Sequence, residues 1–274
     1  PADAVATVET NKELGPLLGF LGEEKLPWRV LGRGTNVLAR DEGFAGVILL
    51  LGEEFKTVGE PQKKSAGTAL LQVGGGAGLG KLSHSCIEMG LSGLEFGCGI
   101  PGTLGGAVIM NAGAWGAEMA SVVSSVTLVT ATGEKILTGD ELDFAYRRWR
   151  GFEQYHGKAV VTSVELALVK EDPEVIRNRC RKLQERRQAA QPIAYANAGS
   201  FFKNPQNDSA GRLIEASGLK GTSVGGAMVS LQHANFLVNR GGATASDMLS
   251  LMKVVQDRVR NDKGIELEPE VHFI

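Results

Sequence analysis

Short runs of apolar or alternating residues, separated by glycine and charged residues, dominate the chain up to about residue 170. Such runs are typical of β-strands that bury one or both faces. They predict strands over Trp28–Leu31, Gly46–Leu51, Ala69–Val73, Val122–Thr130 and Ala159–Val169. A hairpin turn is expected at Ala131–Glu134, before the apolar pair Ile136–Leu137. Short helices are predicted over Leu79–Met89, which Gly90 ends, and over Asp140–Tyr146.

Helical periodicity dominates after residue 170. Asp172 as N-cap and Pro173 at the first helical position predict a long helix that ends near Ala190. Thr244 predicts the start of a second long helix, which carries an apolar face and ends by Gly264. The apolar positions of that face are Met248, Leu251, Met252 and Val255.

The chain closes on a strict two-residue alternation over Ile265–Phe273, which predicts a final strand. The change from a strand-rich to a helix-rich pattern predicts an α+β protein with two domains. We place them at residues 1–170, with subdomains of about 1–52 and 53–170, and at residues 171–274.

Charge and cysteine content exclude several classes of protein. Lys+Arg 29 against Asp+Glu 31 leaves a net charge of −2, which gives no basic excess for nucleic acid. Cys86, Cys98 and Cys180 are odd in number and far apart, which favours a reducing compartment, and none lies in a zinc-like spacing with histidine. Apolar runs are too short for a membrane span and no secretion signal is visible. We therefore expect a cytoplasmic protein without a structural metal.

Glycine is unusually frequent in this sequence, with 37 residues, fourteen of which lie between Gly74 and Gly116. Two nucleotide motifs in this stretch fail on single residues. Gly75–Lys81 resembles the start of a phosphate loop, but Leu82 replaces the Ser or Thr that ligates magnesium. Gly97–Gly102 matches a dinucleotide fingerprint, but Pro101 lies inside it and no acidic residue follows at the expected distance.

Two other glycine-rich segments remain as candidates for phosphate contacts. Gly32–Asn36 follows a predicted strand, and its amides either converge on an anion or form an ordinary β-turn. Gly99–Ala107 runs into Val108–Gly113, and its glycines allow a helix N-terminus to approach a diphosphate. Two separate phosphate loops imply a dinucleotide.

Five segments follow one another over nearly the whole chain, namely LGRGTNVLARDEGFAGVIL, GLEFGCGIPGTLGGAVIMNAGAWG, AGSFFKNP, HANFLVN and LEPEV. Together they resemble the UDP-N-acetylenolpyruvoylglucosamine reductases of bacterial cell-wall synthesis. Members of that family usually carry a threonine-rich stretch ending in GGPA before the first helix, whereas this sequence opens at Pro1. We therefore expect a further N-terminal segment. The short interval between Arg147 and Ser200 resembles the family's shorter class, which lacks an inserted subdomain with a capping tyrosine.

The resemblance implies a vanillyl-alcohol-oxidase-type FAD-binding domain followed by a smaller α+β substrate-binding domain, whose last strand returns to the flavin site. FAD would be bound non-covalently, so His84 and Cys98 would be unmodified. NADPH would reduce the flavin, and the enolpyruvyl group of the UDP-sugar would take a hydride from flavin N5 to give UDP-N-acetylmuramate. The partners are then the UDP-sugar and NADPH, and a monomer is favoured.

By family motif, the FAD contacts are Gly32, Arg33, Gly34, Thr35, Asn36, Gly99, Ile100, Pro101, Gly102, Thr103, Gly105, Gly106, Asn111 and Gly113. The resemblance assigns catalysis to Arg147, to Ser200 as proton donor and to Glu270. These types suit the reaction, because hydride addition to the enol ether leaves negative charge that a cation and an acid can stabilise.

Each catalytic assignment has a structural alternative. Arg147 lies among Arg148 and Arg150, a pattern typical of a solvated surface cluster, and Ser200 is typical of a turn. Glu270 shares the parity of Glu266 and Glu268, which predicts a solvent-facing edge strand.

Substrate contacts are expected from residues inside the family motifs, namely Tyr146, Lys203, Asn204, His233 and Asn235. His233 is equally compatible with a structural role. Six basic residues crowd the first long helix, and a phosphate clamp by Arg177 and Arg181 competes there with a solvated helix face. They are Arg177, Arg179, Arg181, Lys182, Arg186 and Arg187.

Two other functions remain open at this point. One is an FAD-dependent oxidase of the same fold with another substrate, and the other is a non-enzymatic nucleotide-binding module.

Overall fold

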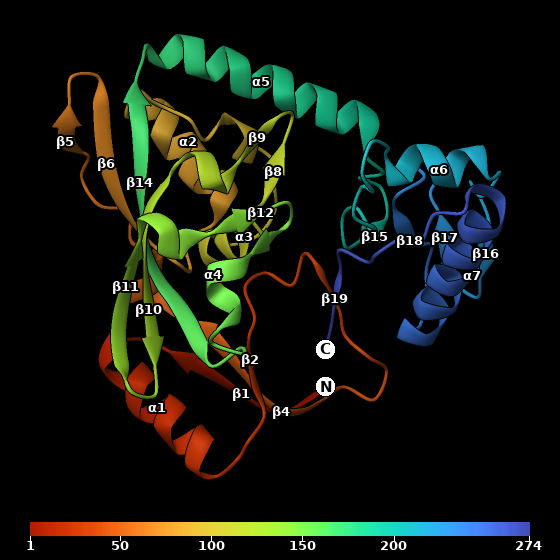
Figure 1. Ribbon diagram of the computed structural model, residues 1–274, viewed down its shortest axis with the longest axis horizontal. Coiled ribbons are helices and arrows are strands. Elements are labelled where there is room, and N and C mark those ends of the chain that lie inside the picture. Colours follow the sequence, from red (N-terminus) through yellow and green to blue (C-terminus); the bar gives the residue numbers. More distant parts are fainter. The chain divides into compact units, whose positions relative to one another are not determined.

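The computed structural model describes residues 1–274, which form two compact units. The larger unit comprises Ala2–Arg33 and Ala45–Glu185. The smaller comprises Pro1, Gly34–Phe44 and Arg186–Ile274, most of it blue in Figure 1. These bounds differ from the predicted division at residue 170, because the chain changes unit within helix α5 and an early segment belongs to the smaller unit. The assignment of cofactor and substrate to the two domains stays a prediction.

Two sheets form the framework of the larger unit. One has the strand order β1-β4-β2 and the other β11-β10-β14-β6-β5, with β7 also paired to β14. All neighbours in the second sheet are antiparallel. The strands are β1 Ala2–Val8, β2 Trp28–Val30, β4 Phe44–Leu51, β5 Gln62–Ser65, β6 Thr68–Gly74, β7 Leu91–Ser92, β10 Val123–Thr130, β11 Gly133–Thr138 and β14 Ala159–Lys170. The five predicted strands and the hairpin are confirmed.

Helices and two small hairpins complete the larger unit (Figure 1). They are α1 Asn11–Glu23, α2 Leu79–Glu88, α3 Leu104–Ile109, α4 Arg150–Glu153, the hairpin of β8 Gly113–Ala114 with β9 Ala117–Glu118, and the hairpin of β12 Phe144–Ala145 with β13 Arg148–Trp149. The main core joins apolar side chains of β6, β10 and β14 to those of α2 and α3, among them Leu71, Leu128, Leu166, Leu82 and Leu104.

Helix α1 is absent from the sequence prediction. Its sequence contains three glycines and Pro16, which disfavour an isolated helix. Leu14, Leu18 and Leu21 recur at helical spacing and are almost fully buried. They pack in a second core with Leu49 of β4. Burial of this apolar stripe therefore compensates for the poor helix propensity.

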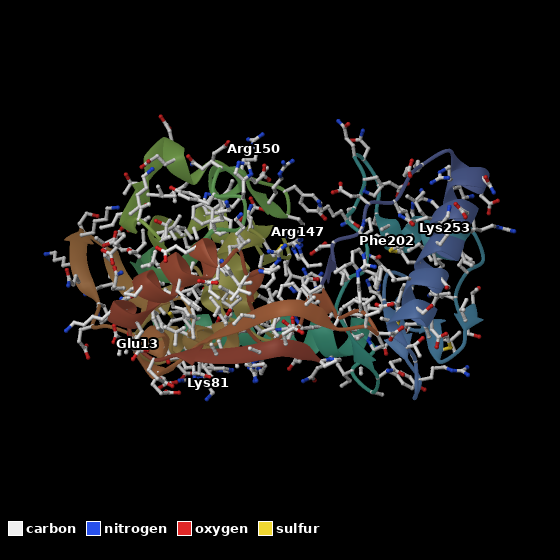
Figure 2. The ribbon with its side chains drawn as sticks, turned by 90° about the horizontal axis from the view of Figure 1, so that it is seen from below. Glu13, Lys81, Arg147, Arg150, Phe202 and Lys253 are labelled. Carbon is white, nitrogen blue, oxygen red and sulfur yellow. The ribbon has the colours of Figure 1, made fainter.

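The smaller unit is built on a four-stranded antiparallel sheet with the order β15-β18-β17-β16, and on a parallel pair of β3 with β19. Its elements are β3 Val37–Leu38, β15 Ala196–Asn197, α6 Ala210–Ala216, β16 Ser223–Val224, β17 Ala227–Val229, β18 Leu237–Asn239, α7 Ala245–Lys263 and β19 His272–Phe273. Helix α7 buries Leu251, Val255 and Val259 in the core that also holds Phe202. In Figure 2, Lys253 extends outward from the same helix.

Both long helices are confirmed, with their predicted caps. The Asp172 carboxylate accepts the Glu174 amide at 2.7 Å at the start of α5, Pro173–Ala190. Thr244 caps α7, and Gly264 ends it with a φ of 69°. No helix of the structure has the length and the apolar character needed to cross a membrane.

Two element predictions are wrong. Only a 3₁₀ turn, Gly139–Leu142, forms within the helix predicted at Asp140–Tyr146, because strand β12 starts at Phe144 and pairs with β13. Only His272–Phe273 forms a strand within the predicted Ile265–Phe273. The preceding residues make isolated contacts instead, such as the bridge between Pro269 and Phe202.

Gly75 lies where β6 ends and fits against neighbouring backbone. A Cβ atom there would lie 2.2 Å from the Val161 carbonyl oxygen. We expect Gly75→Ala to lower the free energy of unfolding by about 2 kcal/mol, since the backbone must shift. Urea unfolding followed by circular dichroism measures this change.

Gly19→Ala in α1 is the matched control. A Cβ at Gly19 meets no atom within 4 Å. Because alanine favours the helix, Gly19→Ala should stabilise the protein by about 0.5–1 kcal/mol. Equal losses in both variants would contradict the close-packing role of Gly75.

Candidate active site

Arg147 joins the two small hairpins of the larger unit. It occupies the loop between β12 and β13, and its guanidinium donates to the carbonyl of Gly113 at 2.8 Å and to that of Asn111 at 3.5 Å. Asn111 is fully buried; its side chain donates to the Ala145 carbonyl at 3.0 Å and accepts the Ala120 amide at 2.9 Å. The three predicted residues Asn111, Gly113 and Arg147 therefore form one hydrogen-bonded group.

The backbone at this group is strained. Asn111, Trp115 and Arg147 have φ values of 41°, 59° and 54°, in the left-handed region that side chains disfavour. Such a conformation costs about 1 kcal/mol or more per residue and concentrates at functional sites. Here it fixes the direction in which Arg147 leaves its hairpin.

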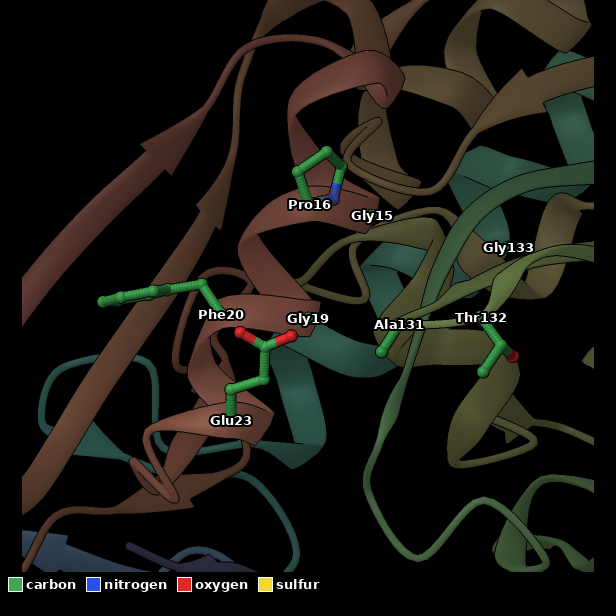
Figure 3. Close-up of a pocket in the computed structure, with 8 residues that line it drawn as sticks. All are labelled: Gly15, Pro16, Gly19, Phe20, Glu23, Ala131, Thr132 and Gly133. Atoms are coloured by element: carbon green, nitrogen blue, oxygen red, sulfur yellow. The ribbon is translucent and has the colours of Figure 1, made fainter.

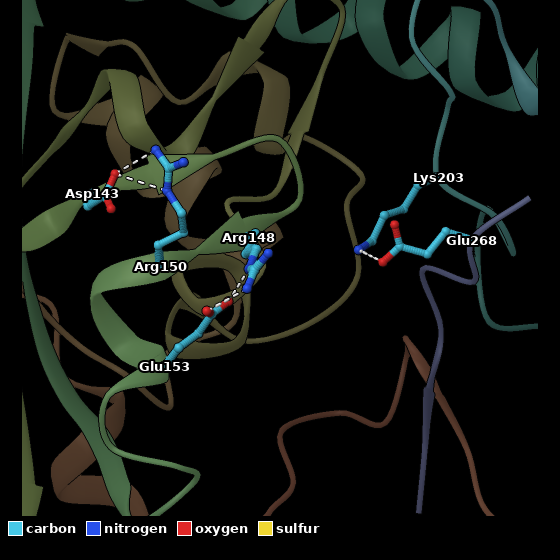
Figure 4. Close-up of polar contacts among 6 residues, drawn as sticks. All are labelled: Asp143, Arg148, Arg150, Glu153, Lys203 and Glu268. Atoms are coloured by element: carbon cyan, nitrogen blue, oxygen red, sulfur yellow. Dashed lines mark hydrogen bonds and ion pairs between the residues drawn. The ribbon is translucent and has the colours of Figure 1, made fainter.

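The neighbouring arginines behave differently. Arg148 pairs with Glu153, and Arg150 pairs with Asp143 at 2.8 Å, in exposed ion pairs (Figure 4). Arg147 is half-buried, and its guanidinium also lies 5.0 Å from the centre of the Tyr146 ring. The surface-cluster alternative thus describes Arg148 and Arg150 but not Arg147.

The two glycine-rich loops meet in the larger unit. A Cβ atom on Gly32 would lie 2.6 Å from Thr103 Oγ1, so only glycine allows this approach. Gly99 and Gly102 have φ values of 84° and 132°, which L side chains rarely adopt. In this unit the amides of Gly32, Gly99, Gly102 and Thr103 donate to no protein acceptor. These amides fit a diphosphate.

The first turn of α3 does not supply the expected free amides. The Leu104 and Gly105 amides donate to the carbonyls of Ala77 and Gly75, both at 2.8 Å. The Gly106 amide is 3.4 Å from Thr103 Oγ1. An anion would therefore meet the loop before α3 rather than the helix N-terminus, which is a correction of the sequence interpretation.

Ser200 precedes a segment that Asn235 holds in the smaller unit. Asn235 is 3% exposed, and its amide side chain accepts from the Phe202 amide at 3.0 Å and donates to the Phe202 carbonyl at 2.8 Å. The Asn235 carbonyl accepts the Phe201 amide. Within this unit the Ser200 hydroxyl makes no hydrogen bond, while Phe201 and Phe202 anchor the segment in the core.

The three C-terminal glutamates, which lie at every second position of the sequence, differ in their surroundings. Glu266 pairs with Arg260 at 2.8 Å, and Glu268 pairs with Lys203 (Figure 4). Glu270 is half-buried, and its amide donates to the Phe201 carbonyl at 2.8 Å. Glu270 is thus hydrogen-bonded to the segment that follows Ser200, and the solvent-facing alternative describes Glu266 and Glu268 only.

Several predicted ligand-binding residues have structural roles instead. Asn111 and Asn235 are buried, and their side chains bind backbone groups, so direct contacts with FAD or substrate are not supported. His233 is half-buried; its Nδ1 accepts the Asn235 amide at 3.2 Å and its ring meets Phe236 edge-on. Asn204 accepts the Ala210 amide at the start of α6 at 3.1 Å. The substrate contacts of Lys203 and Tyr146 stay predictions.

Gly34, Thr35 and Asn36 begin the early segment of the smaller unit. Asn36 Nδ2 donates to the Glu270 carbonyl at 3.1 Å. In the same segment, the Asp41 carboxylate accepts two amides at the start of α7. The sequence pattern assigns no role to Asp41, because its partners lie more than two hundred residues further along the chain.

Three arginines of α5 form ion pairs within the larger unit. Arg177 pairs with Glu88 and Glu174, and Arg181 lies 4.0 Å from Glu185. Arg179 pairs with Glu171 and with the buried Glu95. A solvated helix face therefore describes them better than a phosphate clamp.

A shallow hollow of the larger unit lies away from these groups (Figure 3). It is lined by Gly15, Pro16, Gly19, Phe20, Glu23, Ala131, Thr132 and Gly133. None of these residues belongs to the candidate site, so we assign it no function.

Comparisons with known proteins now define the class. A family profile described as an FAD-binding domain matches residues 2–139, so the chain is a flavoprotein of the FAD-binding class. A second profile, the C-terminal domain of UDP-N-acetylenolpyruvoylglucosamine reductase, matches residues 191–274. The α+β fold class and the use of FAD predicted from the sequence are both confirmed.

Relatives in several bacteria match the chain over its whole length. UDP-N-acetylenolpyruvoylglucosamine reductase 2 of Symbiobacterium thermophilum is 45% identical over 99% of this chain and 85% of its own. The reductase of Desulfosudis oleivorans is 42% identical over 100% and 89%. The crystal structure of the Thermus caldophilus reductase is 38% identical, covers 98% of this chain and 91% of that one, and has a TM-score of 0.81. The chain belongs to the UDP-N-acetylenolpyruvoylglucosamine reductase family.

Asn111 provides a test of the strained group. We expect Asn111→Ala to lower the free energy of unfolding by about 2–3 kcal/mol, because it leaves the Ala145 carbonyl and the Ala120 amide unpaired in the interior. Asn207→Ala is the matched control, since Asn207 has a φ of 65° but is exposed. Its loss should be about 1 kcal/mol or less. Chemical unfolding compares the two, and equal losses would contradict the buried role.

The stability of the protein should depend on the protonation of His233. Burial, with Lys220 nearby, lowers the pKa of His233 below its ordinary value. Protonation therefore favours the unfolded chain, so this contribution to stability is complete above about pH 6.5 and is lost as the pH falls below it.

Urea unfolding at pH 7.5 and pH 5.5 measures this loss. His233→Gln should reduce the difference between the two pH values, whereas His84→Gln, on the exposed surface of α2, should leave it as in the wild type. An unchanged difference in His233→Gln would show that other groups cause it.

Proposed function

We propose that this protein catalyses the NADPH-dependent reduction of the enolpyruvyl group of UDP-N-acetylenolpyruvoylglucosamine to UDP-N-acetylmuramate, a step in peptidoglycan precursor synthesis. Membership of the reductase family over the whole chain supports the activity. The structural observation that carries it is the conformation of Arg147, half-buried on a strained hairpin loop and hydrogen-bonded to Gly113.

The larger unit holds the cofactor in this proposal. Bound FAD supplies an acceptor for the hydride of NADPH and a donor of hydride to carbon. The unpaired amides of Gly32, Gly99, Gly102 and Thr103 bind the diphosphate, because backbone N–H groups in a glycine-rich turn favour anions. Gly105 and Gly106 contribute through the lack of a side chain rather than through their amides.

Arg147 stabilises negative charge on the substrate. Reduction of the enol ether at its terminal carbon places negative charge on the adjacent carbon and its carboxylate. A guanidinium that is already fixed by the Gly113 carbonyl meets this charge without having to reorganise, which is how preorganised groups lower a barrier. Lysine at this position lacks the planar fork that reaches both carbonyls and substrate.

Ser200 and Glu270 provide the acidic groups. Ser200 Oγ donates the proton to the carbon adjacent to the carboxylate, and the carboxyl group of Glu270, in its protonated form, stabilises the negative charge by donating a hydrogen bond. The rigid Phe201–Phe202 anchor limits the motion of Ser200, and the bond of the Glu270 amide to the Phe201 carbonyl connects the two backbones. Lys203 and Tyr146 are proposed substrate contacts.

Ser200→Ala tests the assignment of the proton donor. NADPH should bleach the flavin in this variant at the wild-type rate, whereas reoxidation by the UDP-sugar should slow by about 100-fold or more, since general acid catalysis is worth that much. Stopped-flow absorbance separates the two steps. Ser223→Ala, an exposed serine of β16, is the control and should match the wild type in both.

Other outcomes of this experiment favour other functions. Equal slowing of both steps would contradict the role of Ser200. Reoxidation of the wild-type flavin by oxygen alone, with no effect of the UDP-sugar, would favour an oxidase. A protein that binds FAD but is not reduced by NADPH would favour a non-enzymatic nucleotide-binding module.

A further inference from the structure

Helix α5 packs against the larger unit through one face. Ile176, Arg179 and Cys180 lie on that face, because they occupy positions i, i+3 and i+4 of the helix. Ile176 and Cys180 are almost fully buried in an apolar cluster with Cys98. Cys98 directly precedes the loop Gly99–Thr103, which supplies most of the amides proposed to bind FAD. This face of α5 is therefore in contact with the residue that leads into the loop.

Glu95 connects Arg179 to the start of the same segment. Glu95 is only 9% exposed. Its Oε1 accepts the Arg179 guanidinium and the Ser92 hydroxyl, both at 2.9 Å, and its Oε2 accepts the Gly93 amide at 2.8 Å. Arg179 also pairs with Glu171. Both oxygens of Glu95 thus have donors, and Arg179 is the donor that supplies the positive charge a carboxylate with so little exposure requires.

Backbone hydrogen bonds carry this restraint from Glu95 into the loop. Glu95 is the first residue of the 3₁₀ helix η2, Glu95–Gly97. Its carbonyl accepts the Cys98 amide at 3.0 Å, and the Gly97 carbonyl accepts the Ile100 amide at the same distance. The position of Glu95 therefore determines the course of the backbone as far as Ile100, which lies inside the loop.

Helix α2 holds the loop from the other side. The Gly102 carbonyl accepts the Leu79 amide at 3.1 Å. Gly97 lies so close to α2 that a Cβ atom on it would be 2.6 Å from Ser83 Oγ. Between β7 and α3, η2 is the only helix or strand. The loop therefore takes its conformation from its contacts with α2 and α5 rather than from a regular element of its own.

We propose that helix α5 preorganises the loop Gly99–Thr103 for FAD, with Glu95 and Arg179 as positioning residues. The inference rests on the proposed function, which assigns amides of this loop to the FAD diphosphate. A loop that is already in its binding conformation binds FAD more tightly, because the apparent dissociation constant rises as the binding-competent fraction falls. Arg179 acts through Glu95 in this proposal and does not itself bind phosphate.

Titration of the full-length apoprotein with FAD, followed by flavin fluorescence, measures this effect. Arg179→Met keeps an apolar stem but leaves Glu95 without a cation, so the dissociation constant for FAD should rise by about tenfold or more. Arg177→Met is the matched control, since Arg177 lies on the same helix and its side chain is equally exposed, at 43%. Its ion pairs are with exposed partners, so its dissociation constant should stay within about twofold of the wild type.

Hydrogen–deuterium exchange distinguishes local positioning from a general loss of stability. In the Arg179→Met apoprotein, amide exchange in peptides that cover 93–103 should be faster than in the wild type by about fivefold or more. Peptides from β10 should exchange at the wild-type rate, because the contacts of Arg179 do not reach that strand. Arg177→Met should leave both sets of peptides unchanged.

A second substitution tests whether the unpaired charge is the cause. Glu95→Gln removes the charge and keeps an acceptor for the Gly93 amide. Added to Arg179→Met, it should lower the dissociation constant for FAD by about threefold or more relative to Arg179→Met alone, because a buried amide needs no cation. Arg179→Lys keeps the charge but loses the planar fork that pairs with two carboxylates, and its affinity should lie between those of the wild type and Arg179→Met.

Three results would overturn the proposal. The first is an Arg179→Met variant that binds FAD as tightly as Arg177→Met does. The second is faster exchange in β10 as well as over 93–103, since reduced overall stability would then explain weaker binding. The third is a double variant that binds FAD no better than Arg179→Met. If Arg179→Met does not fold, Arg179→Lys is compared with Arg177→Lys, and equal FAD affinities of these two would have the same consequence.

The proposed reductase activity is tested separately. None of these measurements uses NADPH or the UDP-sugar. Failure of the UDP-sugar to reoxidise the wild-type flavin would therefore remove the proposed function and leave the measured effect of Arg179 on FAD binding standing.

Discussion

Close contact between backbones around Gly75 is the constraint on which the larger unit depends. Gly75 donates its amide to Thr162 of β14 and accepts the amide of Gly105, both at 2.8 Å. A Cβ atom on Gly75 would lie 2.2 Å from the Val161 carbonyl oxygen, and one on Gly105 would lie 3.1 Å from the Gly75 carbonyl oxygen. The end of β6 and the start of α3 are therefore held together by main-chain hydrogen bonds, with no side chain between the two backbones. Both the loop Gly99–Thr103 before α3 and the buried Asn111 after it take their positions from this contact.

Local signals in the sequence predict the elements whose energetics are local. The caps at Asp172 and Thr244 satisfy amides within their own helices, so a few neighbouring residues suffice to predict where α5 and α7 begin. Helix α1 has a local start signal, since the Glu13 carboxylate accepts the Thr10 amide, but its glycines and Pro16 disfavour a helix. Packing against distant strands therefore contributes much of its stability. The false helix at Asp140–Tyr146 shows the opposite case, in which a helical pattern yields to the pairing of β12 with β13.

The candidate site shows the same division between local and distant information. A resemblance to family motifs selects Arg147 from three arginines and Glu270 from three glutamates, which composition and parity cannot do. The structure adds the physical distinction, since Arg148, Arg150, Glu266 and Glu268 form exposed ion pairs. Motif membership alone predicts too many ligand contacts. Asn111 and Asn235 also belong to the motifs, but the oxygen and the nitrogen of each side-chain amide are hydrogen-bonded to backbone groups.

The burial of Asn111 and Asn235 explains how Arg147 and Ser200, which are not fully buried themselves, are held in place. Each side-chain amide supplies hydrogen bonds that regular secondary structure would otherwise provide. Asn111 does so for the hairpin that carries Arg147, and Asn235 does so for Phe202, two residues after Ser200. A buried amide that lost a partner would cost about 1–3 kcal/mol, so each hydrogen-bonded arrangement resists small displacements. The left-handed conformations of Asn111 and Arg147 are tolerated for the same reason, because the surrounding bonds outweigh a strain of about 1 kcal/mol at each. Rigidity at these positions is therefore obtained from interior amides, which hold the backbone around Arg147 and the backbone that follows Ser200.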